Sequence, residues 1–152
     1  MIKSLKIISH NDKQTQVLGE KIAPILGKGR IAFLKGDLGS GKTTFVKGIT
    51  KYYKCAQQAK SPTFILISTY IGSIDVNHCD FYRITNPEEI FDLALEELLE
   101  KGNLIIEWPE VVSKYISIPD IELFFSVIND TEREIILTFK NNKILDEFKS
   151  NE

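Results

Sequence analysis

The stretch GDLGSGKT, from Gly36 to Thr43, lies between two segments with different apolar spacing. Arg30–Lys35 before it is a short apolar run typical of a buried strand, and Thr43–Tyr53 after it carries apolar residues at helical spacing. The stretch itself matches G-x-x-x-x-G-K-[S/T] at every position. A strand, a glycine-rich loop and a helix in this order predict a P-loop in an α/β fold.

Each residue type in the loop suits phosphate binding. The glycines allow consecutive backbone N–H groups to turn inward around phosphate oxygens. The start of the following helix adds the positive end of its dipole, the Lys42 ammonium would reach the β and γ phosphates, and the Thr43 hydroxyl would bind Mg²⁺. We therefore expect ATP and Mg²⁺ as cofactors. The expected nucleotide-binding residues of this segment are Gly36, Asp37, Leu38, Gly39, Ser40, Gly41, Lys42, Thr43 and Thr44.

Acidic residues further along the chain supply candidates for a second metal ligand. Glu107 ends the apolar run that begins at Leu104, where such a ligand usually lies, although a strand-end carboxylate can also serve only solubility. Asp80 lies in an alternating segment with His78, and we favour a position beside the magnesium ion. The alternative is an amphipathic strand with a solvated polar face and a structural, hydrogen-bonded His78. Trp108 would line the site or fill the edge of the core.

The remaining pattern predicts one α/β domain over residues 1–152, with a mixed parallel and antiparallel sheet flanked by helices. Ser61–Thr63 is a candidate mobile loop that meets the γ-phosphate. The expected strands are Leu5–Ile8, Asn103–Glu107, two antiparallel strands within Thr63–Asp80 that reverse at Gly72-Ser73, and a hairpin of Ile121–Ile128 with Glu134–Phe139. One expected helix is capped by Asn11 and interrupted at Pro24, and another is capped by Asn86 and ends at Lys101-Gly102. The segment from Asn141 is expected to be a loose tail or a short helix.

Composition narrows the class of protein. A net charge of -2 gives no basic footprint for nucleic-acid or membrane binding by the chain alone. Two cysteines without CxxC spacing and two histidines are too few for a zinc site and fit a reducing compartment. No apolar run is long enough to span a bilayer, so we expect a cytoplasmic protein.

Four motifs together closely resemble the bacterial TsaE family, the small ATPase of tRNA threonylcarbamoyladenosine biosynthesis. The resemblance implies an ATPase that acts with TsaB and TsaD to modify the adenosine at position 37 of tRNAs that read codons starting with A, so that tRNA is met only through the complex. The motifs are Gly36–Phe45, Ser61-Pro62-Thr63-Phe64, His78-x-Asp80-x-Tyr82-Arg83 and Glu107-Trp108-Pro109-Glu110. The chain departs from the usual pattern at Ser40 and Cys79, both small replacements.

The same resemblance assigns roles to single residues. It makes Lys42 the phosphate-binding lysine, Thr43 and Glu107 magnesium ligands, Asp80 an essential acidic residue near the metal, and Trp108 a site residue. It also implies nucleotide contacts from an acidic residue at the start of the first helix and an arginine in the last hairpin. At those two positions this chain has Asp12 and Arg133.

Three other functions compete with an ATPase. A small-molecule P-loop kinase would need several arginines, and the chain has only Arg30, Arg83 and Arg133. A GTPase would need N-K-x-D, which the segment Asn142–Asp146 misses by one residue. A nucleotide-dependent regulatory module without significant turnover fits nearly every residue. Because no arginine finger or water-positioning glutamine is identified, we expect hydrolysis by the protein alone to be slow.

Overall fold

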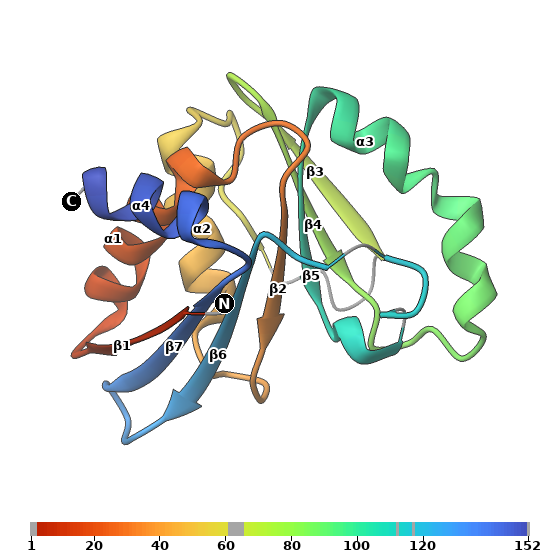
Figure 1. The fold of residues 1–152 in the computed structure, drawn as a ribbon. Helices are drawn as coiled ribbons and strands as arrows, with labels where there is room; N and C mark the ends of the chain where they lie inside the picture. The colour runs from red at the N-terminus through yellow and green to blue at the C-terminus, as the bar shows by residue number, and fades with distance from the viewer. Residues whose placement is uncertain (1–2, 61–65, 112, 117, 152) are drawn as a thin grey trace.

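A mixed β-sheet forms the centre of the molecule, in the order β1-β7-β6-β2-β5-β4-β3 (Figure 1). The computed structural model describes residues 3–60, 66–111, 113–116 and 118–151. Within these residues the strands are β1 (Lys3–Ser9), β2 (Ile31–Lys35), β3 (Ile67–Ile71), β4 (Asp75–Asp80), β5 (Gly102–Glu107), β6 (Ile121–Val127) and β7 (Arg133–Phe139). The expected strands and both expected hairpins are confirmed.

The middle of the sheet is parallel and its margins are antiparallel. Strand β2 runs parallel to both β5 and β6, and β4 runs parallel to β5. The hairpins β3–β4 and β6–β7 and the pair β1–β7 are antiparallel. Consequently β2, β4, β5 and β6 end at one edge of the sheet, where ligands bind in open α/β folds. The predicted α/β fold with a mixed sheet is confirmed.

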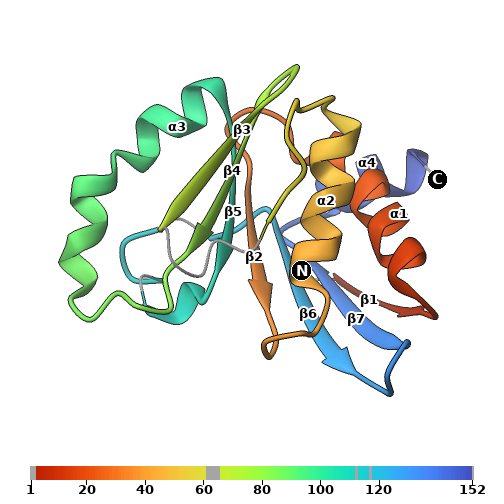
Figure 2. The same ribbon diagram turned by 180° about the vertical axis from the view of Figure 1, so that it is seen from behind.

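Helices cover both faces of the sheet. The helices α1 (Asp12–Ile22), α2 (Lys42–Tyr52) and α4 (Asn142–Ser150) lie together on one side, and α3 (Leu95–Lys101) lies on the other (Figures 1 and 2). Short 3₁₀ turns occupy Ala23–Ile25 (η1), Pro87–Leu93 (η2) and Pro109–Val111 (η3). None of the helices in the described part of the chain is long and apolar enough to cross a membrane.

Alternation along β2 divides the core into two parts. Ala32 and Leu34 pack into the cluster beneath α1, α2 and α4, whereas Ile31 and Phe33 pack into the cluster beneath η2 and α3. Successive side chains of a strand point to opposite faces, so a strand covered on both sides reads as a continuous apolar run. This explains why Arg30–Lys35 could be recognised as buried from its sequence.

Asparagine side chains cap the first turns of α1 and α4, and the cap at Asn11 was expected. The Asn11 side chain accepts a hydrogen bond from the Gln14 backbone N–H at 2.9 Å, and the helix passes into the 3₁₀ turn η1 at Pro24. Asn141 accepts from the Ile144 N–H at 3.0 Å. The last segment is therefore a helix and not a loose tail, since α4 also buries Phe148 in the core.

The continuous helix expected from Asn86 to Lys101 is wrong. Asn86 does cap a turn, but η2 ends at Leu93. The next residue, Ala94, has a φ of 52°, and α3 starts at Leu95. At about 100° per residue, a straight helix would place Ile90 and Leu99 on opposite sides. The left-handed Ala94 lets both parts pack on the same apolar cluster, so tertiary packing overrides the local helix signal.

The helices α1 and α2 approach each other at two glycines. A Cβ on Gly48 would lie 2.0 Å from the Gln16 carbonyl oxygen, and one on Gly19 would lie 2.1 Å from that of Phe45. Backbone atoms cannot yield as a side chain does, so the contact requires glycine on both helices. The position of α2, which carries the P-loop lysine, depends on this contact.

Replacing Gly48 by alanine tests the close contact. We expect Gly48→Ala to lower the free energy of unfolding by about 2 kcal/mol or more, because overpacking outweighs the gain in helix propensity. Gly27→Ala is the matched control, since a Cβ there meets nothing within 4 Å. Urea denaturation of both variants measures the difference, and equal stabilities would show that the helices can move apart at little cost.

Candidate functional site

A cavity of about 600 Å³ opens at the edge where the parallel strands end. The loop after β2, the last residue of β4 and the last residue of β5 meet there because Asp80 pairs with Glu107 and Leu34 pairs with Glu107 in the strand register. The lining residues are Asp12, Leu38, Gly39, Gly41, Lys42, Thr43, Thr44, Asp80, Tyr82, Glu107, Trp108 and Arg133. Three separate sequence motifs thus contribute to one cavity.

The glycine-rich loop takes a backbone course that requires glycine. Gly36 and Gly41 have φ values of 140° and 106°, in the region that side chains disfavour. At Gly36 a Cβ would also lie 2.6 Å from the Phe125 carbonyl oxygen of β6. Helix α2 begins immediately afterwards at Lys42, so the unpaired N–H groups of its first turn and its dipole favour an anion at the cavity.

A buried ion pair joins the loop to the end of β5. Lys42 and Glu107 are each only 6% exposed, and Lys42 Nζ lies 3.3 Å from Glu107 Oε1. The same ammonium donates a hydrogen bond to the Gly36 carbonyl at 2.5 Å. A carboxylate that served only solubility would be exposed, so this alternative for Glu107 is wrong.

The second oxygen of Glu107 is held by a histidine. His78 on β4 is fully buried and its Nε2 donates to Glu107 Oε2 at 2.5 Å. The solvated polar face considered for this strand is therefore wrong at His78, whereas its interpretation as a hydrogen-bonded structural histidine is confirmed. Each carboxylate oxygen of Glu107 has a partner, which fixes the side chain at the base of the cavity.

The two carboxylates have pKa values shifted in opposite directions. Burial favours a raised pKa for Glu107, but the hydrogen bond and charge of His78, together with Lys42, lower it below its ordinary value. Burial raises the pKa of Asp80, and the Tyr82 backbone N–H that donates to Asp80 Oδ1 at 2.9 Å offsets only part of this effect. Glu107 is thus the more firmly ionised of the pair.

An aromatic pair lines the cavity together with these carboxylates. The rings of Trp108 and Tyr82 lie 4.9 Å apart between centroids, and Lys42 Nζ lies 5.3 Å from the Trp108 ring. Trp108 has a φ of 56°, which costs of order 1–3 kcal/mol for a residue of this size. The strained backbone turns the ring toward the lysine, so Trp108 lines the site and does not merely fill the core edge.

The oxygen atoms around the cavity fit a hard divalent cation. Thr43 contributes a hydroxyl, and Asp80 and Glu107 contribute carboxylates, which are the ligand types that Mg²⁺ binds. No group of three or more His, Cys, Asp or Glu side chains in the described residues forms a complete metal cage. Magnesium commonly takes only one or two carboxylates and completes its shell with water and phosphate oxygens, so this donor set suits it.

Asp12 and Arg133 also line the cavity. Arg133 begins β7 and pairs in register with Ser9, the last residue of β1, so the start of α1 lies beside it. Its Nη2 donates to the Gly39 carbonyl oxygen at 3.3 Å. The structure thus brings both residues to the glycine-rich loop from segments more than a hundred residues apart in the sequence.

Some expected site residues lie elsewhere. Gly36 and Asp37 line an adjoining cavity of about 150 Å³, and the buried Ser40 hydroxyl, which lines neither, has no hydrogen-bond partner among the described residues. The candidate loop Ser61–Thr63 lies outside the described residues. Conversely, Tyr82 was not assigned to the site, although its place two residues after Asp80 in an extended segment was a usable signal.

The support that His78 gives to Glu107 has a measurable effect on stability. His78→Ala is expected to lower the free energy of unfolding by about 2–4 kcal/mol, because it leaves a buried carboxylate oxygen without a donor and opens a cavity. His10→Ala removes a histidine whose side chain is 61% exposed, and should cost less than about 1 kcal/mol. Urea unfolding would contradict the assignment if the two losses were equal.

Comparison with known proteins agrees with these features. A family model described as "Threonylcarbamoyl adenosine biosynthesis protein TsaE" matches residues 9–135. Similar sequences include the tRNA threonylcarbamoyladenosine biosynthesis protein TsaE of Rickettsia felis, 34% identical over 92% of this chain and 84% of that protein, and the protein of the same name from Bacillus subtilis, 31% identical over 93% and 90%. The crystal structure of Bacillus subtilis YdiB superimposes with a TM-score of 0.78 at 26% identity, over 99% of this chain and 97% of that one.

Proposed function

The chain belongs to the TsaE family, which takes part in tRNA threonylcarbamoyladenosine biosynthesis, and from this premise we propose that it is a magnesium-dependent ATPase. We propose that its protein partners are TsaB and TsaD. Together the three proteins would form threonylcarbamoyladenosine in tRNAs that read codons starting with A. The proposal also places the protein in the cytoplasm, with tRNA bound through the complex and not by this chain alone.

The observation that carries the proposal is the buried pair of Lys42 and Glu107 at the floor of the cavity. A lysine at the end of a P-loop and a carboxylate at the end of the neighbouring parallel strand are the two charges that a nucleotide with magnesium requires. In the structure they neutralise each other. Bound phosphates would offer Lys42 a second anionic partner, and Glu107 would be one of the residues that hold the metal.

Each residue has a role in this scheme that follows from its position. Lys42 and the first-turn N–H groups of α2 bind the phosphates. Thr43, Asp80 and Glu107 are the proposed metal ligands, and His78 keeps Glu107 oriented. Bound magnesium would supply charge stabilisation to the transferring phosphoryl group. Trp108 lines the cavity beside Lys42 and contacts the ring of Tyr82.

The small number of arginines at the cavity favours slow hydrolysis over phosphoryl transfer to a metabolite. Arg133 is the arginine found among the described lining residues of the cavity. Arg30 pairs with Glu147 on α4, with Nη1 and Oε2 3.2 Å apart. Kinases of the P-loop class hold the transferring phosphate with several arginines, so a small-molecule kinase fits this cavity less well.

Two substitutions separate binding from hydrolysis. Lys42→Ala should weaken ATP binding severely, because it removes the ammonium that contacts the phosphates. Glu107→Ala should retain part of the binding and lose magnesium-dependent hydrolysis. The fluorescence of Trp108, the only tryptophan in the chain, measures binding, and released phosphate measures hydrolysis. Equal loss of binding in both variants would mean that Glu107 is only structural.

A regulatory module that binds ATP without turnover is the remaining alternative. It is separated from an ATPase by single-turnover hydrolysis with the purified protein, alone and with TsaB and TsaD. The ATPase proposal expects slow phosphate release alone and faster release with the partners. If ATP binds but no phosphate is released in either setting, the regulatory alternative is correct.

A further inference from the structure

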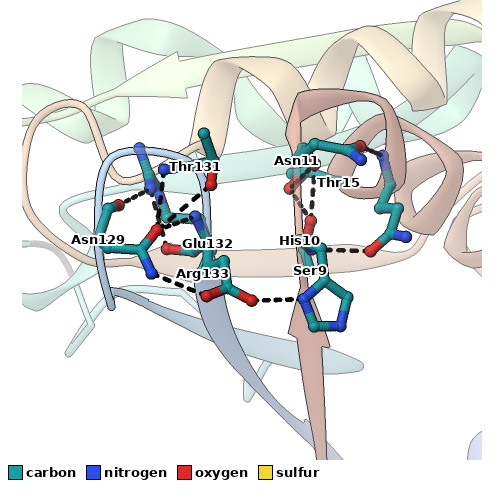
Figure 3. Close-up of polar contacts among 9 residues, drawn as sticks. Ser9, His10, Asn11, Thr15, Asn129, Thr131, Glu132 and Arg133 are labelled. Atoms are coloured by element: carbon teal, nitrogen blue, oxygen red, sulfur yellow. Dashed lines mark hydrogen bonds and ion pairs between the residues drawn. The ribbon is translucent and has the colours of Figure 1, made fainter.

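A network of polar contacts ties the start of α1 to the turn between β6 and β7 (Figure 3). His10, between β1 and α1, contacts Glu132 through Nδ1 and a carboxylate oxygen. The other oxygen of Glu132 accepts a hydrogen bond from Asn129 Nδ2 at 2.7 Å. Glu132 therefore joins two segments that lie more than a hundred residues apart in the sequence.

The turn on the Glu132 side is itself well defined. Asn129 Oδ1 accepts from the Thr131 N–H at 3.0 Å and the Glu132 N–H at 2.9 Å, which is the usual geometry of an asparagine-stabilised turn. Arg133 Nη1 donates to the carbonyl oxygens of Asn129, at 2.7 Å, and Glu132, at 2.9 Å. The same guanidinium reaches the glycine-rich loop at Gly39.

The segment on the His10 side is equally constrained. The His10 backbone N–H donates to Gln14 Oε1 at 2.7 Å, and the Gln14 N–H donates back to the Asn11 side chain at 2.9 Å. The Ser9 and Thr15 hydroxyls meet beneath this cap at 2.7 Å and are buried. Asp12, the first residue of α1, is thus presented to the cavity from a rigid helix start.

We propose that His10 and Glu132 are positioning residues that hold Arg133 against the glycine-rich loop and so fix the part of the nucleotide cavity that Arg133 and Asp12 line. The inference rests on the proposed nucleotide-binding function, and neither positioning residue lines the cavity. The guanidinium has five donors, and its carbonyl contacts leave it the full positive charge to offer an anionic ligand. The turn and the helix cap fix the direction in which that charge points.

The electrostatics of the pair agree with this role. The hydrogen bond from Asn129, followed by that from His10, lowers the pKa of Glu132, so the carboxylate that bridges the two segments is an ionised acceptor. The side chains of His10 and Glu132 are 61% and 32% exposed. An exposed pair contributes little to overall stability, which allows its effect on the cavity to be measured without unfolding the protein.

The test measures ATP affinity through Trp108 fluorescence. His10→Ala and Glu132→Ala should each weaken ATP binding by about two- to fivefold, the range of an exposed ion pair, and Arg133→Ala by about tenfold or more. In a protein that already carries Arg133→Ala, adding His10→Ala or Glu132→Ala should not weaken ATP binding further, because each residue acts through the arginine. The double variant of His10→Ala with Glu132→Ala should bind ATP no more weakly than either of these single variants. His10→Lys should bind ATP more tightly than His10→Ala, because the lysine gives Glu132 a cation to pair with.

The chain offers a matched control on β1 and β7, the two strands next to His10 and Glu132. Lys6 on β1 and Glu134 on β7 form an ion pair with Nζ and Oε2 3.2 Å apart that includes none of the residues of the His10–Glu132 network. Lys6→Ala should leave ATP affinity unchanged. The proposal is overturned if this control weakens binding as much as His10→Ala, or if His10→Ala and Glu132→Ala still weaken binding in the Arg133→Ala background.

A second readout keeps the positioning role separate from the proposed function. In the free protein, the backbone amide resonance of Gly39 should shift in His10→Ala and Glu132→Ala, as it does in Arg133→Ala, but not in Lys6→Ala. A wild-type protein that does not bind ATP would refute the nucleotide proposal and still leave this comparison to be made. An unchanged Gly39 resonance in both variants would refute the positioning role.

Discussion

The ion pair between Lys42 and Glu107 is the interaction on which the site depends. Two charges that are only 6% exposed are tolerated because each compensates the other and because Gly36 and His78 provide further hydrogen bonds to them. The parallel register of β2, β5 and β4 brings these groups to one edge of the sheet. The glycines of the loop and of the α1–α2 contact allow α2 to start where its lysine meets the carboxylate.

Much of this arrangement could be predicted from the sequence because its signals are local. The glycine loop between a strand and a helix, the carboxylate ending an apolar strand and the asparagine caps each depend on neighbouring residues only. The break at Ala94 could not be predicted, because the local signals favour one helix and only packing on a shared cluster requires two. The complete burial of His78 was hidden for the same reason, since alternation alone does not tell which face of a strand another helix covers.

The positively charged residues that line the cavity, Lys42 and Arg133, differ in their contacts. Near Trp108 the charges are buried, paired and held by short hydrogen bonds, so a ligand must exchange partners with them. Near Arg133 the contacts are exposed and made to backbone carbonyl oxygens, so the arginine keeps its charge available. In the proposed complex a phosphate chain would have two cations to contact, Arg133 with its charge available and Lys42 in exchange for its contact with Glu107.

The central claim is that the cavity is a nucleotide site that serves threonylcarbamoyladenosine formation. It is tested most directly by depleting the protein in its own cell and measuring that nucleoside in digested tRNA by mass spectrometry, with plasmid copies of the wild type and of Glu107→Ala. The account predicts that the nucleoside falls on depletion, returns with the wild type and stays low with the variant expressed at the same level. Unchanged nucleoside after depletion, or full recovery with Glu107→Ala, would contradict it.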